Sequence, residues 1–155
     1  MSDSHNYLNY DEILSHWAKH RPTTVATEQY DRKLTYEDLD ELTRRAISMF
    51  QSKGLTKGDR IAWLGKNSDL YAVLFAAAAR CGVVMAPVGW RLAPPEIAYI
   101  LKDTGSKLVF AGAEFTEIAH QVSSELEPSP EGIVEEDAWG FIKAQEFAEY
   151  EAPDP

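Results

Sequence analysis

The sequence has one cysteine and no long hydrophobic segment among its 155 residues. The single thiol, Cys81, excludes an internal disulfide, and its place before Gly82 at an expected helix end favours packing over reactivity. The longest apolar run, residues 70–79, is about half as long as a membrane span requires. The first residues also lack the basic and apolar regions of a secretory signal. We therefore expect a soluble protein in the reducing cytoplasm.

Basic residues are also scarce. Fifteen lysines and arginines against 25 aspartates and glutamates give a formal net charge of −10. This charge repels nucleic-acid backbones and anionic lipid headgroups, so nucleic acid is a poor candidate partner. With 45% hydrophobic and 26% charged residues, the composition is that of a globular protein, and the length allows one core of ordinary size.

The standard catalytic and cofactor motifs are absent. No glycine-rich dinucleotide fingerprint follows an expected strand, residues 54–59 lack the Lys-Ser/Thr of a phosphate loop, and no Gly-x-Ser-x-Gly elbow occurs. Of the four histidines, only His16 and His20 stand at i, i+4, and they lack the glutamate of a metalloprotease helix. The pair therefore favours a solvated helix face over a metal site.

Apolar spacing and capping signals predict an α/β fold. Before residue 60 they predict a helix from Asn9 to about His20, a hairpin of 25–30 and 33–35 joined at Asp31-Arg32, and a long helix from Thr35 to Gly54. From there they predict strand 60–65, helix 68–81, strand 83–88, helix 94–104, strand 107–111 and helix 114–126. This alternation is typical of a parallel, doubly wound (flavodoxin-like) sheet flanked by helices, here with a small N-terminal hairpin.

The continuous apolar run 83–88 fits a central strand, which is covered on both faces. Residues 127–132 are expected to form a loop, and 138–150 a last helix buried through Trp139, Ile142 and Phe147. Residues 151–155 have the composition of a linker.

Three short stretches are candidate ligand positions, because parallel α/β sheets bind ligands beyond the carboxyl ends of their strands. They are residues 65–67, 89–91 and 112–114. The second contains Trp90 and Arg91, a large indole and a positive charge placed where the chain has just left an apolar strand.

Read together, "WAKHRP", "LTYEDLDELTRRA" and residues 54–110 resemble the N-terminal part of adenylate-forming, AMP-binding enzymes, the acyl-CoA synthetase and luciferase superfamily. The likeness is greatest to a fatty-acid or medium-chain acyl-CoA ligase and runs from about Ile13 to Phe110. Its landmarks are Thr35-Tyr36, Gly58-Asp59-Arg60, Asn67-Ser68, Gly82-Val83, Arg91-Leu92 and Tyr99-Ile100-Leu101 with Asp103. Gly58-Asp59-Arg60 and Asn67-Ser68 also read simply as a turn and a helix cap.

The resemblance implies a ligase that uses ATP, Mg²⁺ and coenzyme A. Members of this superfamily convert a carboxylic acid to an acyl-adenylate with release of pyrophosphate, and most then transfer the acyl group to the thiol of CoA. The family's phosphate loop, aromatic-Thr-Glu metal motif, ribose-binding aspartate and catalytic lysine have no match here. The resemblance thus implies that residues 1–126 are the N-terminal α/β subdomain of a longer enzyme. Residues 127–155 would lead to the remainder, and this chain would be inactive alone.

By the same resemblance, Arg91 occupies the position of an arginine that lies near the 3′-phosphate of CoA, with Trp90 shielding it or stacking on the adenine. A guanidinium suits phosphate because it is always charged and donates two parallel hydrogen bonds. Alternatively, Arg91 pairs only with Glu96 while Trp90 covers the sheet end. Gly89 replaces the asparagine usual in the family, which predicts a freer corner. No catalytic or metal-binding residue is predicted in this chain.

Other functions stay open at this point. The acceptor is CoA or a carrier protein, and the acid, fatty or aromatic, is unspecified. The expected partners are the acid, CoA, and the remainder of the enzyme or a complementary chain, with a second copy of the chain as a further candidate. A stand-alone, non-catalytic module that binds CoA or a protein is the alternative of a different class, against which the apolar runs 61–64 and 83–86 argue. A flavodoxin-like receiver or redox module lacks its aspartate cluster and its flavin-phosphate loop.

Overall fold

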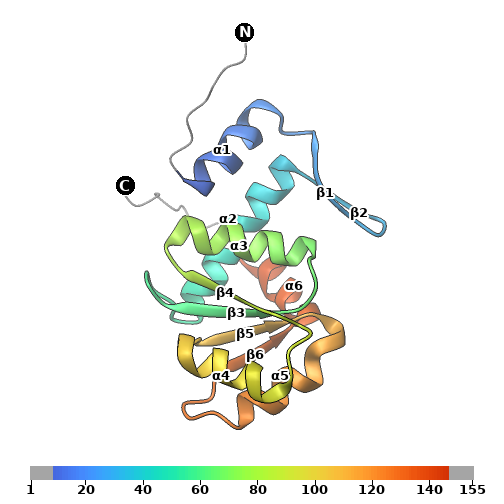
Figure 1. The fold of residues 1–155 in the computed structure, drawn as a ribbon. Helices are drawn as coiled ribbons and strands as arrows, with labels where there is room; N and C mark the ends of the chain where they lie inside the picture. Colours follow the sequence, from blue (N-terminus) through green and yellow to red (C-terminus); the bar gives the residue numbers. More distant parts are fainter. Residues whose placement is uncertain (1–8, 147–155) are drawn as a thin grey trace.

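Figure 1 shows a computed structural model of the chain, which describes residues 9–146. The elements in chain order are α1 (Tyr10–His20), β1 (Val25–Gln29), β2 (Arg32–Thr35), α2 (Tyr36–Ser52), β3 (Arg60–Leu64), α3 (Asp69–Cys81), β4 (Val84–Val88), α4 (Pro94–Thr104), β5 (Leu108–Ala111), a 3₁₀ turn η1 (Ala113–Phe115), α5 (Thr116–Ser124), β6 (Glu131–Val134) and α6 (Glu135–Ala144). Strands β3 to β6 form a parallel sheet in the order β4-β3-β5-β6, and β1 pairs with β2 in an antiparallel hairpin. The predicted fold class is confirmed.

Side-chain caps fix where the first three helices begin. The Asn9 side chain accepts a hydrogen bond at the start of α1, Thr35 and Asp38 form a reciprocal capping box on α2, and Ser68 caps α3. Helix α3 ends at Gly82 in the left-handed conformation. Within residues 9–146 no helix has the length and hydrophobicity needed to cross a bilayer.

The sheet separates two apolar layers because successive strand residues point to opposite faces. On one face, Ile61 and Trp63 pack with α2, α3 and α6. On the other, Ala62 and Leu64 pack with α4 and α5. Figure 1 shows this arrangement, with the hairpin and α1 at the end of the molecule away from α4 and α5. Helices therefore cover both faces of β3 and β5.

The strand predicted to be central is an edge strand, so that prediction is wrong. Within residues 9–146, β4 pairs only with β3 and leaves Val84 48% exposed, whereas β3 and β5 occupy the centre of the sheet. An apolar run shows that a strand lacks a wet, polar face, but it carries no information about strand order.

The predicted loop at 127–132 is also wrong in its last residues, because Glu131–Val134 forms β6 and pairs with β5. β6 and α6 extend the sheet and its cover beyond residue 126. The last helix ends at Ala144, and Phe147 and residues 151–155 lie outside the described residues. In the hairpin, the turn lies at Tyr30-Asp31, and Arg32 already belongs to β2.

A buried charge network joins the first three helices. The Arg80 guanidinium, on α3, donates to Asp11 of α1 and to Asp40 of α2, the latter at 2.7 Å. Its side chain is only 6% exposed. Burial lowers the pKa of Arg80, but the hydrogen bonds that its guanidinium donates to Asp40 and Asp11 outweigh this effect, so the pKa is raised and the group stays charged.

Removing this guanidinium is expected to destabilise the fold strongly. Arg80→Ala leaves Asp40 and Asp11 without their shared partner in a buried site, which should lower the free energy of unfolding by about 3 kcal/mol. Arg44→Ala is the matched control, because Arg44 pairs with the same Asp40 at 2.8 Å from an exposed position, and it should cost less than about 1 kcal/mol. Urea midpoints at unchanged m-value measure both. Equal losses of unfolding free energy in the two variants would contradict the expectation that the buried arginine contributes more than the exposed one.

The single thiol, Cys81 at the end of α3, is expected to react slowly. Burial raises the pKa of Cys81, which keeps the sulfur protonated at neutral pH. A chromogenic disulfide reagent at pH 7.5 should modify the native protein at least about tenfold more slowly than the same protein in urea. Equal rates in the two states would show that the thiol is accessible and unperturbed.

Candidate functional site

The three predicted ligand positions meet at one edge of the sheet. Residues 65–67 follow β3, 89–91 follow β4 and 112–114 follow β5, and the parallel register aligns the ends of these strands. The chain runs from β3 to β4 on one side of β3 and then crosses to β5 on the other side of β3. The carboxyl ends of β3 and β5 therefore mark the topological switch point of the sheet, where doubly wound proteins bind ligands.

Gly65 lets the loops after β3 and β5 approach each other. A Cβ on Gly65 would lie 2.8 Å from the Trp63 indole and 3.2 Å from the Gly112 amide nitrogen. The Gly112 N–H donates to the Leu64 carbonyl at 3.0 Å. Any side chain at Gly65 would force these loops apart, so the glycine has a packing role here.

The corner after β4 is a tight turn. The Leu92 N–H donates to the Gly89 carbonyl at 3.0 Å and closes the turn around Trp90 and Arg91. A Cβ on Gly89 would lie 3.3 Å from the Leu92 side chain, so a larger residue would require Leu92 to shift. Leu92 itself packs against the apolar layer under α4. The backbone hydrogen bond and the packed Leu92 side chain hold this corner in place. From Gly89 alone we had expected a freer corner.

Trp90 is the centre of a cluster of side chains at this edge. Its indole is 37% exposed, and its ring centroid lies 6.0 Å from that of Phe115. The Arg91 guanidinium carbon lies 4.3 Å from the indole centroid and the Lys66 Nζ 5.4 Å from it. Both distances allow cation–π attraction. Two cations thus lie next to the indole, one from its own loop and one from the loop after β3.

Arg91 does not pair with Glu96. The Glu96 carboxylate accepts the Ala93 N–H at 2.8 Å and completes the start of α4. Among residues 9–146, no carboxylate forms an ion pair with Arg91. The guanidinium is exposed and is positioned by the indole. An arginine held in this way keeps its full charge available to an anion.

Two carboxylates border the same edge. Glu114 pairs with Lys66 at 2.6 Å, and Glu135, at the start of α6, accepts the Ala113 N–H at 3.3 Å. Lys66 and Glu114 lie within the predicted ligand positions 65–67 and 112–114, but their pairing was not predicted, since nothing in the local pattern joins two residues 48 positions apart. The only usable signal was that both immediately follow strands of one parallel sheet.

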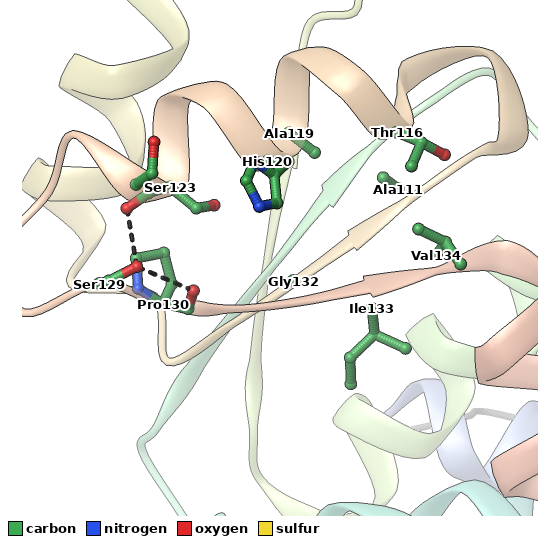
Figure 2. Close-up of a pocket in the computed structure, with 11 residues that line it drawn as sticks. Ala111, Thr116, Ala119, His120, Ser123, Ser129, Pro130, Gly132, Ile133 and Val134 are labelled. Atoms are coloured by element: carbon green, nitrogen blue, oxygen red, sulfur yellow. Dashed lines mark hydrogen bonds between the residues drawn. The ribbon is translucent and has the colours of Figure 1, made fainter.

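A separate pocket of about 280 Å³ lies between α5 and β6 (Figure 2). Its lining is Ala111, Thr116, Ala119, His120, Ser123, Ser124, Ser129, Pro130, Gly132, Ile133 and Val134. The Ser129 hydroxyl donates to the Ser123 carbonyl at 2.8 Å, and the buried Ser123 hydroxyl has no partner within the described part of the chain. His120 hydrogen-bonds none of these hydroxyls in that part.

The two histidines lie one turn apart on α1, where His16 is half-buried and His20 is exposed. The rings of His16 and His20 stack at 4.1 Å, and His20 Nδ1 contacts the His16 carbonyl oxygen at 2.8 Å. Across residues 9–146 no group of three or more His, Cys, Asp or Glu side chains could hold a metal ion.

Known proteins with similar sequences and folds are carboxylic-acid ligases. A fatty acid–[acyl-carrier-protein] ligase of Streptomyces coeruleorubidus is 39% identical over 123 residues, which is 79% of this chain and 23% of that protein. A long-chain-fatty-acid–CoA ligase of Mycobacterium tuberculosis is 37% identical over 98 residues, or 63% of this chain and 20% of that protein. The chain thus spans about a fifth of the length of these relatives.

The fold comparison agrees. The N-terminal domain of FACL13 from Mycobacterium tuberculosis superposes with a TM-score of 0.86 at 28% identity, covering 96% of this chain and 39% of that one. A benzoate CoA ligase from Burkholderia xenovorans shares the fold with a TM-score of 0.87 at 22% identity, covering 96% and 31%. The model of AMP-binding enzymes matches residues 14–155. The chain therefore belongs to the AMP-binding enzyme family, in which it corresponds to the N-terminal portion of the ligases.

Proposed function

We propose that this chain is the N-terminal section of an ATP-dependent acyl-CoA ligase. The complete protein would activate a fatty or aromatic carboxylic acid as its acyl-adenylate and transfer the acyl group to the thiol of CoA. Within it, Arg91 would contact the 3′-phosphate of CoA, with Trp90 orienting the guanidinium. The names of the relatives, which act on fatty acids and hydroxybenzoates, support this class of acid.

One observation carries the assignment of the corner: Arg91 is fixed 4.3 Å from the indole of Trp90, without a carboxylate partner in the described residues, at the ligand-binding edge of the sheet. A phosphate reaching this edge finds an oriented, always charged donor. The remaining exposed surface of Trp90 is available to an apolar or aromatic part of the same ligand.

The adenylation half-reaction is expected to depend on other parts of the complete protein. ATP would supply the adenylyl group and Mg²⁺ would neutralise its phosphates, but the described residues contain no cluster of metal ligands. We expect this chain to be inactive alone, because the family's phosphate loop and catalytic lysine have no match in it.

CoA is favoured over a carrier protein as the acceptor because of the unpaired cation at the corner. Free CoA bears a 3′-phosphate on its adenosine, and the phosphopantetheine arm of a carrier protein does not. The relatives include ligases of both kinds. Arg91 would therefore bind the 3′-phosphate of free CoA, but it would have no such group to bind on a carrier protein.

A stand-alone binding module remains the alternative, and one argument against it weakens. Residues 61–64 are fully packed inside this chain, so they mark no contact face, and Val84 is the main apolar exposure on β4. The native mass of the gene product separates the two functions. We expect a product several times larger than 17.4 kDa, detected by antibody or mass spectrometry in the source cells. A product of that mass that stays monomeric and binds CoA would establish the module instead.

Charge reversal at the corner is expected to affect only one half-reaction. In the complete protein, Arg91→Glu should raise the KM for CoA by about tenfold or more, because one charge-assisted hydrogen bond is replaced by repulsion. Acid-dependent exchange of pyrophosphate into ATP, which reports adenylation, should stay within about twofold of wild type.

Lys102→Glu, on the exposed last turn of α4, is the matched charge reversal and should leave both measurements unchanged. If Arg91→Glu damages pyrophosphate exchange as much as CoA transfer, the proposed contact is wrong. If the wild-type protein transfers acyl groups only to a carrier protein, CoA is not the acceptor.

A further inference from the structure

Lys66 reaches the Trp90 corner from a different loop, the one that follows β3. Its Nζ lies 5.4 Å from the indole centroid, and the Arg91 guanidinium lies 4.3 Å from the same point. The two positive charges can be no further apart than the sum of these distances, close to the Debye length of about 10 Å at 0.1 M salt. An anion at the corner therefore interacts with both cations at once.

The two cations differ in what neutralises them. Arg91 has no carboxylate partner within residues 9–146, whereas Lys66 pairs with Glu114 at 2.6 Å. That ion pair is open to water on both sides, since the Lys66 side chain is 55% exposed and that of Glu114 66%. Exposed pairs of this kind are weak and exchange readily.

A phosphate at the corner competes with Glu114 for the same ammonium group. A phosphate monoester carries up to two negative charges and three acceptor oxygens, against one charge on the carboxylate. It also gains Arg91 as a second partner, which Glu114 lacks. Glu114, in turn, repels an anion that approaches Lys66. The carboxylate thus both holds Lys66 near the indole in the empty state and opposes the ligand.

We propose that Lys66 and Arg91 form one phosphate site around Trp90, and that Glu114 limits its affinity by competing with the phosphate for Lys66. The inference rests on the proposed function, since it takes the 3′-phosphate of CoA as the ligand. It adds a second specificity-determining cation and a carboxylate that regulates release. Binding exchanges the Lys66–Glu114 pair for a Lys66–phosphate pair, and product release restores it.

The two side chains are expected to change CoA affinity in opposite directions. In the complete protein, Lys66→Ala should raise the KM for CoA by about three- to tenfold, as expected for loss of one hydrogen bond to a charged group. Glu114→Gln should lower it by about two- to fivefold, because the competing charge is removed. Both shifts should shrink with rising salt. Thermal melting temperatures should stay at the wild-type value, since both side chains are exposed.

A double-mutant cycle isolates the competition. If Glu114 acts through Lys66, Glu114→Gln should have a smaller effect in the Lys66→Ala background than in the wild type. With 3′-dephospho-CoA as the acceptor, neither variant should shift the KM. Glu117→Gln is the matched control, because it removes the same charge from the exposed first turn of α5, and it should have no effect.

Arg91→Glu, measured beside these variants, separates the two proposals. A raised KM for CoA in Arg91→Glu with no shift in Lys66→Ala or Glu114→Gln would overturn the shared site and leave the proposed function intact. An unchanged KM in all three would remove the Trp90 corner from the CoA site, whereas a complete protein that transfers no acyl group to CoA would overturn the proposed function itself. A raised KM in Glu114→Gln would show that the carboxylate supports the ligand, and equal shifts with 3′-dephospho-CoA would remove the 3′-phosphate as the group recognised.

Discussion

Hydrogen bonding of β3 to strands on both of its sides is the constraint on which the rest of the structure depends. The parallel pairing of β3 with β4 and β5 places the loops that follow the three strands at one edge. It also buries residues 61–64 of β3, so helices must cover both faces. At that edge Gly65 permits a backbone approach that a side chain would block. The close contact of loops 65–67 and 112–114 brings Lys66 to Glu114, and the same edge holds Trp90.

The net charge of the whole chain makes the local cations at the Trp90 corner necessary for binding an anion. A net charge of −10 repels a polyphosphate at long range, so its capture must depend on local, oriented cations. Trp90 supplies the orientation, because an indole attracts a guanidinium without neutralising it. A carboxylate in the same place would fix Arg91 equally well but would cancel the charge that a phosphate needs.

Local signals in the sequence predicted local structure well. Asn9, Thr35 and Ser68 cap the helices that they were expected to begin, since a cap depends on neighbours three residues away. Strand order depends on distant partners, which is why the apolar run at 83–88 was placed at the centre although β4 forms an edge. β6 escaped notice because it has four residues, includes Gly132 and buries only Ile133. The Arg80 network was equally hidden, because its partners Asp11 and Asp40 lie 69 and 40 positions away.

Arg80 and Arg91 illustrate two uses of the same side chain. Arg80 is buried against two carboxylates, so its charge is consumed in joining helices, and the site has no capacity left for a ligand. Arg91 sits on an indole at the sheet edge and has no such partner in the described residues. An arginine with a structural role has hydrogen bonds to carboxylates that neutralise its charge. An arginine that binds a ligand is held in one orientation and has no carboxylate that neutralises it. Among the described residues, Arg91 meets this criterion at the carboxyl ends of the parallel strands, which is where an anionic substrate is expected to bind.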